Sequence, residues 1–138
     1  MSARYDKILI STKGFDDFVD ITLKIKNVVS SFGIQNGILN LYLTSPCASL
    51  KIIEREPGLD MDLSKLMETI LPINKVYQHD NVWYDGNASA HLKSIILGNS
   101  LNLPIIDSNI YLGLNQQIIL LDFDNKPSQK EIIVSVVG

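Results

Sequence analysis

Apolar residues alternate in short runs near both ends of the chain, whereas in the middle they recur at helical spacing. Near the amino terminus, residues 7–11 are typical of a β-strand, Lys13-Gly14 of a turn, and residues 15–21 of a returning strand. This pattern predicts an opening hairpin. A 3.6-residue apolar period then predicts a helix over residues 22–32, which ends at Gly33.

The rest of the chain continues with short strands and two further helices. Pro46 interrupts an otherwise extended region and indicates a bend or an edge position. Gly98 follows an apolar helical run and is typical of a helix C-terminus. The predicted elements are strands at 38–44 and 50–53, a helix from Asp60 to about Pro72, a polar loop over 74–86, a helix at 88–97, and strands at 101–106, 110–112, 116–123 and 131–136.

The order of these elements predicts the fold class. Strands at both ends with short helices between them do not give the regular strand-helix alternation of a doubly wound parallel sheet. We therefore expect an α+β fold, a sandwich of mostly antiparallel strands with about three helices. A length of 138 residues, of which 46% are hydrophobic, is enough for one core, so residues 1–138 are expected to form a single domain.

Composition and charge exclude several classes of function. The formal net charge is −3 and 20% of residues are charged, which argues against binding to nucleic acid or to an anionic membrane surface. The longest apolar runs are far shorter than the roughly 20 residues that span a bilayer. Because the chain has one cysteine and no secretory signal pattern, we expect a cytoplasmic protein.

Three side chains offer metal-binding or acid-base chemistry. His79 and His91 are the only histidines, and two imidazoles brought together could ligate zinc or shuttle protons. Two ligands do not complete a zinc site, because protein zinc sites normally supply three or four. Cys47 is the natural third ligand, although a small buried hydrophobe is the commoner role of a lone cysteine.

Carboxylates add candidates for a general base or a metal ligand. Asp80 directly follows His79, and Glu54 follows a predicted strand, although such residues are more often solvated. The common phosphate-loop, dinucleotide, hydrolase, zincin and thioredoxin-like signatures are missing from the sequence. Any phosphate binding must therefore use scattered groups.

Four short motifs, taken together, resemble those of the YjbQ family in order and spacing. The resemblance runs from about Asp6 to Gly138. The motifs are Tyr77-Gln78-His79-Asp80, Asn87-Ala88-Ser89-Ala90-His91-Leu92-Lys93, Leu97-Gly98-Asn99-Ser100 and Leu112-Gly113.

The resemblance implies a YjbQ-like α+β fold, a homotrimer, and a divalent metal, zinc or magnesium, held by three histidines. It also implies a secondary thiamine-phosphate synthase activity, in which a metal could neutralise the departing pyrophosphate of a phosphorylated small molecule. His79 and His91 match two of the family's histidines. The positions expected at the pocket are Asp80 and Glu54 as catalytic groups and Asn87, Ser100 and Gln116 as ligand-binding groups.

The third family histidine is replaced. Ser45 stands in its position, followed by Pro46 and Cys47, so Cys47 could replace the lost ligand after a modest backbone shift. Ser89 and the Leu114-Asn115 pair are further departures from the family motifs. Two readings remain: a site retuned for another ligand, or a non-catalytic trimeric scaffold or small-ligand-binding protein with a degenerate site.

Overall fold

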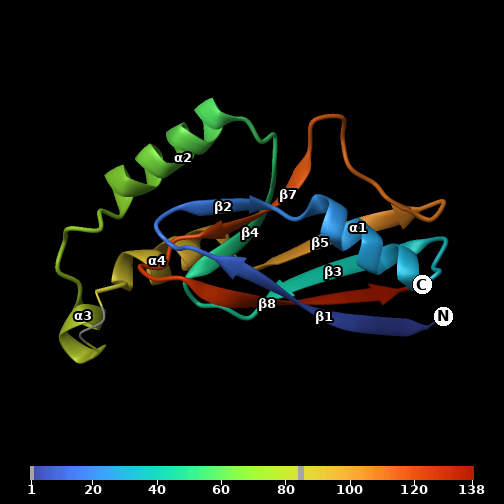
Figure 1. Cartoon of the computed structure of the whole chain (residues 1–138), viewed down its shortest axis with the longest axis horizontal. Helices are drawn as coiled ribbons and strands as arrows, with labels where there is room; N and C mark the ends of the chain where they lie inside the picture. The colour runs from blue at the N-terminus through green and yellow to red at the C-terminus, as the bar shows by residue number, and fades with distance from the viewer. Residues whose placement is uncertain (1, 84–85) are drawn as a thin grey trace.

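Two antiparallel sheets form the centre of the fold (Figure 1). The computed structural model describes residues 2–83 and 86–138. In that part of the chain the elements are β1 (Ala3–Thr12), β2 (Asp17–Asp20), α1 (Thr22–Ser31), β3 (Gly37–Leu43), β4 (Ala48–Ile53), α2 (Pro57–Ile70), α3 (Gln78–Trp83), α4 (Ala88–Leu97), β5 (Ser100–Ile106), β6 (Asn109–Ile110), β7 (Gln117–Asp122) and β8 (Ser128–Val137).

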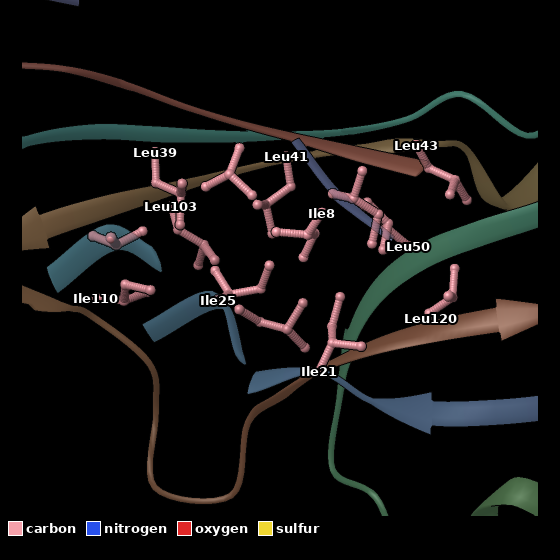
Figure 2. Packing of buried hydrophobic residues seen from close by; sticks show 14 of the residues in the cluster. Ile8, Ile21, Ile25, Leu39, Leu41, Leu43, Leu50, Leu103, Ile110 and Leu120 are labelled. Atoms are coloured by element: carbon pink, nitrogen blue, oxygen red, sulfur yellow. The ribbon is translucent and has the colours of Figure 1, made fainter. Parts of the chain in front are cut away.

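The main core lies between the five-stranded sheet, ordered β1-β8-β3-β5-β6, and a layer made of α1 and the three-stranded sheet, ordered β2-β7-β4. Alternate residues of β3, such as Leu39 and Leu41, point into this core and are fully buried. Figure 2 shows Ile21, just before α1, and Ile25, in the first turn of α1, among the same side chains. The α+β sandwich expected from the sequence is therefore confirmed.

Strand β7 is buried on both faces. Leu120 belongs to the main core, whereas Ile119 and Leu121 belong to a second cluster that contains Met67 of α2 and Ala90 of α4. The continuous apolar run of β7 follows from this position, because a strand covered on both sides needs no polar alternation. Helix α4 is thereby held against the three-stranded sheet, and this contact positions the candidate site.

The expected opening hairpin is wrong. Strand β1 pairs with β8 in one sheet, and β2 pairs with β7 in the other. Between them Gly14, Phe15 and Asp16 all have positive φ values of 79°, 55° and 60°, which turn the chain from one sheet to the other. A Cβ atom on Gly14 would lie 2.8 Å from the Asp124 carbonyl oxygen, so this turn requires glycine.

Helices around the polar loop differ from the prediction in two ways. Helix α2 starts at Pro57, three residues earlier than expected, because the Glu56 carboxylate caps it by accepting N–H groups of Gly58 and Leu59. The segment expected as a loop contains α3, a helix of six residues that begins with four polar ones and is too short to show an apolar stripe. Within the described residues, no helix is both long and apolar enough to cross a membrane.

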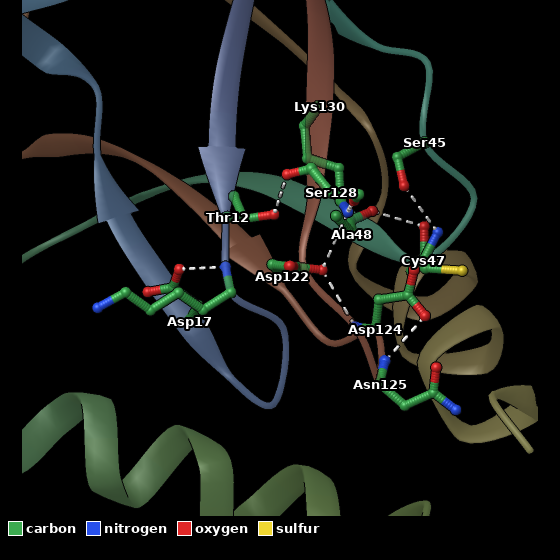
Figure 3. Close-up of polar contacts among 12 residues, drawn as sticks. Thr12, Asp17, Ser45, Cys47, Ala48, Asp122, Asp124, Asn125, Ser128 and Lys130 are labelled. Carbon is green, nitrogen blue, oxygen red and sulfur yellow. Dashed lines mark hydrogen bonds and ion pairs between the residues drawn. The ribbon is translucent and has the colours of Figure 1, made fainter.

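A charged pair is buried between the two sheets. Lys130 of β8 lies 3.6 Å from the Asp122 carboxylate of β7, and the two residues are 3% and 0% exposed. The Lys130 ammonium also donates to the Ser128 hydroxyl. Figure 3 shows this pair beside Cys47 and Asp124. The pair therefore joins the sheets next to the connections that carry the candidate site.

Candidate functional site

The only cysteine and the only two histidines of the chain meet in space. Cys47 directly precedes β4, His79 lies in α3, and His91 lies in the first turn of α4. The Cys47 Sγ atom is 3.7 Å from His91 Nδ1 and 3.6 Å from Nε2. The two imidazole rings have centroids 4.5 Å apart. These three residues, with Asn87, are called the thiol-imidazole cluster below.

Asn87 connects the members of this cluster. Its Nδ2 group donates to Cys47 Sγ at 3.5 Å and to Asp124 Oδ1 at 3.4 Å. Its Oδ1 atom lies 3.1 Å from His79 Nε2, which donates in this arrangement. Asn87 is 9% exposed, so these contacts are largely shielded from water. The amide therefore holds a thiol, an imidazole and a carboxylate in a fixed relation.

The capping of α4 explains why Asn87 is available for these contacts. Asn87 occupies the N-cap position, where asparagine usually accepts a backbone N–H, but its side chain makes no capping bond. Instead Asp80 Oδ1 accepts the Ala88 N–H at 3.4 Å, and Asp80 Oδ2 accepts the Tyr77 N–H at 3.2 Å. Asp80 thus joins α3 to α4 and leaves the Asn87 amide turned toward the cluster.

Tyr77 stands beside this junction. Its hydroxyl donates to the Pro72 carbonyl oxygen at 2.8 Å. Burial raises the pKa of the Tyr77 hydroxyl, and the nearby carboxylates of Glu68 and Asp80 raise it further. Tyr77 therefore acts in this structure as a neutral hydrogen-bond donor that ties the end of α2 to α3.

Two residues predicted for the pocket lie at a distance from the cluster. Glu54 follows β4 at the opposite end from Cys47, roughly 23 Å away for a strand rise of about 3.3 Å per residue, and it is exposed. Gln116 lies near that same distant end, because Gln117 pairs with Ile53. One chain alone therefore does not bring Glu54 and Gln116 to the cluster. Ser100 is exposed at the start of β5 and pairs with Tyr42, which lines a pocket that also reaches His91.

A pocket of about 400 Å³ opens onto the cluster. Its volume lies within the usual range of small-molecule sites, about 300 to 1,000 Å³. The residues that line it come from the β3–β4 connection, α4 and the β7–β8 connection, and they include both basic and hydroxyl side chains. They are Thr44, Ser45, Pro46, Cys47, Asn87, His91, Asp124, Lys126, Ser128, Gln129, Lys130 and Glu131.

Two further hollows help to delimit the site. A second pocket of about 400 Å³ also reaches His91 and shares Ser45 with the first, so His91 stands between two openings. A larger groove of about 840 Å³ runs beside α2, but neither histidine nor Cys47 lines it. The chemistry of the cluster is therefore accessible through the two smaller pockets.

Asp124 is the one member of the network that the sequence prediction missed. The strand predicted at 116–123 ends just before it, yet Asp124 is 6% exposed and contacts Asn87. The only signal was its position two residues after Asp122, at the end of a buried strand. A carboxylate just after a buried strand indicates a buried polar contact, because buried carboxylates need partners.

The donor set has zinc-like chemistry without a complete metal site. A thiol and two imidazoles are the ligand types that zinc prefers. Nevertheless, no three His, Cys, Asp or Glu side chains among the described residues are arranged to hold a metal ion. The Cys47 sulfur is nearly equidistant from Nδ1 and Nε2 of His91, so it faces the part of the ring between these two nitrogens. Alignment of one nitrogen toward a shared ion requires a ring rotation.

Comparisons with known proteins agree on one family. The family model for the UPF0047 protein YjbQ-like group matches residues 6–138. A UPF0047 protein of Methanothermobacter thermautotrophicus is 34% identical over 122 residues, covering 88% of this chain and 83% of the relative. A UPF0047 protein of Archaeoglobus fulgidus is 36% identical over 121 residues, covering 88% of this chain and 91% of the relative.

Solved structures share the fold. A YbjQ-like protein of unknown function from Sulfolobus solfataricus superimposes with a TM-score of 0.93 at 28% identity, covering 99% of this chain and 98% of that one. A hypothetical protein from Aeropyrum pernix gives a TM-score of 0.91 at 25% identity, with 98% of both chains covered. The chain therefore belongs to the UPF0047 family of YjbQ-like proteins.

Proposed function

We propose that the thiol-imidazole cluster binds a zinc-like divalent ion and that the adjoining pocket holds a phosphorylated small molecule. The observation that carries this proposal is the separation of 3.6 to 3.7 Å between Cys47 Sγ and the His91 ring nitrogens. With zinc-sulfur and zinc-nitrogen bonds of about 2.3 and 2.0 Å at a tetrahedral angle, two zinc ligands lie about 3.5 Å apart. Cys47 and His91 lie close to this spacing, and rotation of the His91 ring would aim one nitrogen at the ion.

His79 supplies the third ligand in this proposal. Its ring is packed against that of His91, and its Nε2 atom is engaged by Asn87, so the proposal assigns Nδ1 to the metal. A histidine ligand commonly uses one ring nitrogen for the metal while the other donates to an oriented acceptor. Here the Asn87 carbonyl oxygen provides that acceptor. Cys47 would thus take over the ligand role of the family histidine whose position Ser45 occupies.

The pocket offers an anionic ligand local donors at Lys126 and its hydroxyl groups, although the same lining includes the carboxylates of Asp124 and Glu131. Lys126 is exposed at the rim, and the Ser45 hydroxyl accepts the Cys47 N–H, which leaves its own proton to donate. A bound divalent ion would supply further positive charge toward phosphate oxygens. A transferase of the thiamine-phosphate synthase type is the activity we assign to this arrangement, with the pocket residues binding and orienting the phosphorylated substrate.

Metal-free wild-type protein is expected to bind one zinc ion per chain. Isothermal titration with zinc chloride measures the stoichiometry, and cobalt substitution should give a sulfur-to-metal charge-transfer band from Cys47. Binding to the native state should also raise stability, by about 2.7 kcal/mol when free zinc is 100 times its Kd. Thermal unfolding with and without zinc measures this gain.

Absence of metal would contradict the proposal. Less than about 0.1 zinc per chain in tag-free, reduced protein purified from zinc-supplemented growth is too little for a physiological centre, given the usual affinity of zinc sites. A cobalt spectrum without the sulfur band would show that Cys47 is not a ligand. The pocket would then have to act through hydrogen bonding alone.

We also propose that the chain assembles as a homotrimer. The outer face of the five-stranded sheet exposes apolar side chains, including Ile38 at 60% and Tyr5 at 68%. Ile38 pairs with Val137 on one side and Pro104 on the other, so an apolar row crosses three strands. Sedimentation equilibrium should give about three times the chain mass of 15.4 kDa. A monomer at micromolar concentration would contradict this assembly.

A further inference from the structure

We infer that Asp124 is a positioning residue that sets the orientation of the Asn87 amide and, through it, the tautomer of His79. The inference deepens the proposed metal site and rests on it for its functional meaning. It starts from a contact that no family motif above predicts: Asp124 Oδ1 lies 3.4 Å from Asn87 Nδ2. The geometry of this contact can be tested whether or not a metal binds.

Asp124 is itself held firmly. Its carboxylate accepts the Asn125 N–H at 2.8 Å, and its own N–H donates to Asp122 Oδ1 at 3.1 Å. Its carbonyl oxygen accepts the Phe15 N–H at 2.7 Å, from the turn between β1 and β2. Because two backbone N–H groups and the Asp122 carboxylate hold Asp124, its side chain offers Asn87 an acceptor in one place.

An ionised carboxylate can only accept hydrogen bonds, and this decides which end of the amide faces it. Asn87 must therefore direct Nδ2 toward Asp124, which also aims an N–H at Cys47 Sγ 3.5 Å away. The reversed amide would place a carbonyl oxygen against the carboxylate, which has no proton to donate, whereas the Cys47 thiol can either accept from Nδ2 or donate to Oδ1. Asp124 is thus the neighbour that selects the orientation.

The orientation of Asn87 then determines where His79 carries its proton. With Oδ1 facing His79, the Nε2 atom 3.1 Å away must be the protonated nitrogen of the neutral ring. The lone pair is consequently on Nδ1, the nitrogen that the proposed metal site uses. A reversed amide would favour the other tautomer and place the lone pair toward Asn87.

The direct test is the tautomer of His79 in metal-free wild-type protein. Long-range proton-nitrogen NMR at alkaline pH distinguishes the two neutral forms, and with only two histidines the spectrum is simple to assign. We expect the Nε2-protonated form of His79 to account for nearly all of the population. A predominant Nδ1-protonated form would overturn the inference without any mutation.

The Asp124→Asn variant tests the dependence on the carboxylate. Because an amide at position 124 can accept or donate, Asn87 can reverse, and the His79 population should become a mixture of tautomers. Zinc affinity should fall about 10- to 100-fold, as is usual when the partner of a metal ligand is changed. Asp107→Asn, at an exposed turn, is the matched control and should change neither quantity.

The outcomes separate this inference from the proposed function. An unchanged tautomer population in folded Asp124→Asn protein overturns the positioning role. If wild-type protein binds no zinc, the metal proposal fails, while the metal-free NMR spectra still decide the role of Asp124. If Asp124→Asn does not fold, the metal-free wild-type spectrum decides: a predominant Nδ1-protonated form of His79 overturns the inference, because the Asn87 amide oxygen would then not face Nε2.

Discussion

Replacing His91 with alanine is expected to lower zinc affinity by more than about 100-fold, because even partners outside the ligand shell usually change affinity 10- to 100-fold. His91 contacts Cys47 and packs against His79, so its loss removes the ligand between the other two. Competition with a chelator of known affinity measures the change. The fold should persist without metal, since His91 is only partly buried.

Ile96→Ala is the matched control for that experiment. Ile96 lies on the same helix, is 57% exposed, and lines neither pocket at the cluster. Its replacement should leave zinc affinity unchanged. If His91→Ala alters only the midpoint of thermal unfolding and not zinc binding, the histidines serve an ordinary structural role, and the non-catalytic scaffold becomes the better account of this protein.

Replacing Lys130 with methionine is expected to destabilise the fold by about 3 to 5 kcal/mol, because it leaves an uncompensated charge between the sheets. The Asp122 carboxylate is 0% exposed, and its Oδ2 atom already has no hydrogen-bond partner among the described residues. Urea unfolding monitored by circular dichroism measures the loss. The midpoint should fall without a change in slope if the transition remains two-state.

The double variant Lys130→Met with Asp122→Leu separates the charge from the packing. Removing both charged groups at once leaves no buried ion, so most of the lost stability should return. A double variant as unstable as the single one would show that packing rather than charge dominates. Glu131→Gln, on the next residue of β8 but on the opposite face, provides a control for altered charge on that strand.

The success of the sequence prediction varied with the kind of signal. The helices at residues 22–32 and 88–97 were confirmed almost to the residue. In each, an apolar stripe indicates the helix and a following glycine marks its C-terminal end. Helix α3 was missed because its six residues, four of them polar, are too few to show an apolar period. The opening hairpin was wrong because alternation shows that a segment is a strand but does not show its partner.

Prediction of the candidate site also depended on the kind of signal. His79, Asn87 and His91 were found because their spacing resembles family motifs, and the structure brings them together with Cys47. The position of Glu54 could not be deduced from the sequence. Only the six residues of β4 separate it from Cys47 along the chain, but because the strand is extended they place it at the opposite end of β4. Asp124 was missed because its role depends on a contact across 37 positions.

The pairing of β1 with β8 affects the order in which the protein folds during translation. Ala3 lies opposite Val137, so the first strand has no native neighbour in its sheet until the last strand has left the ribosome. Such long-range pairing forms slowly and leaves an open strand edge in the meantime. The nascent chain therefore depends on β8, which inserts between β1 and β3, to cover the facing edges of both strands.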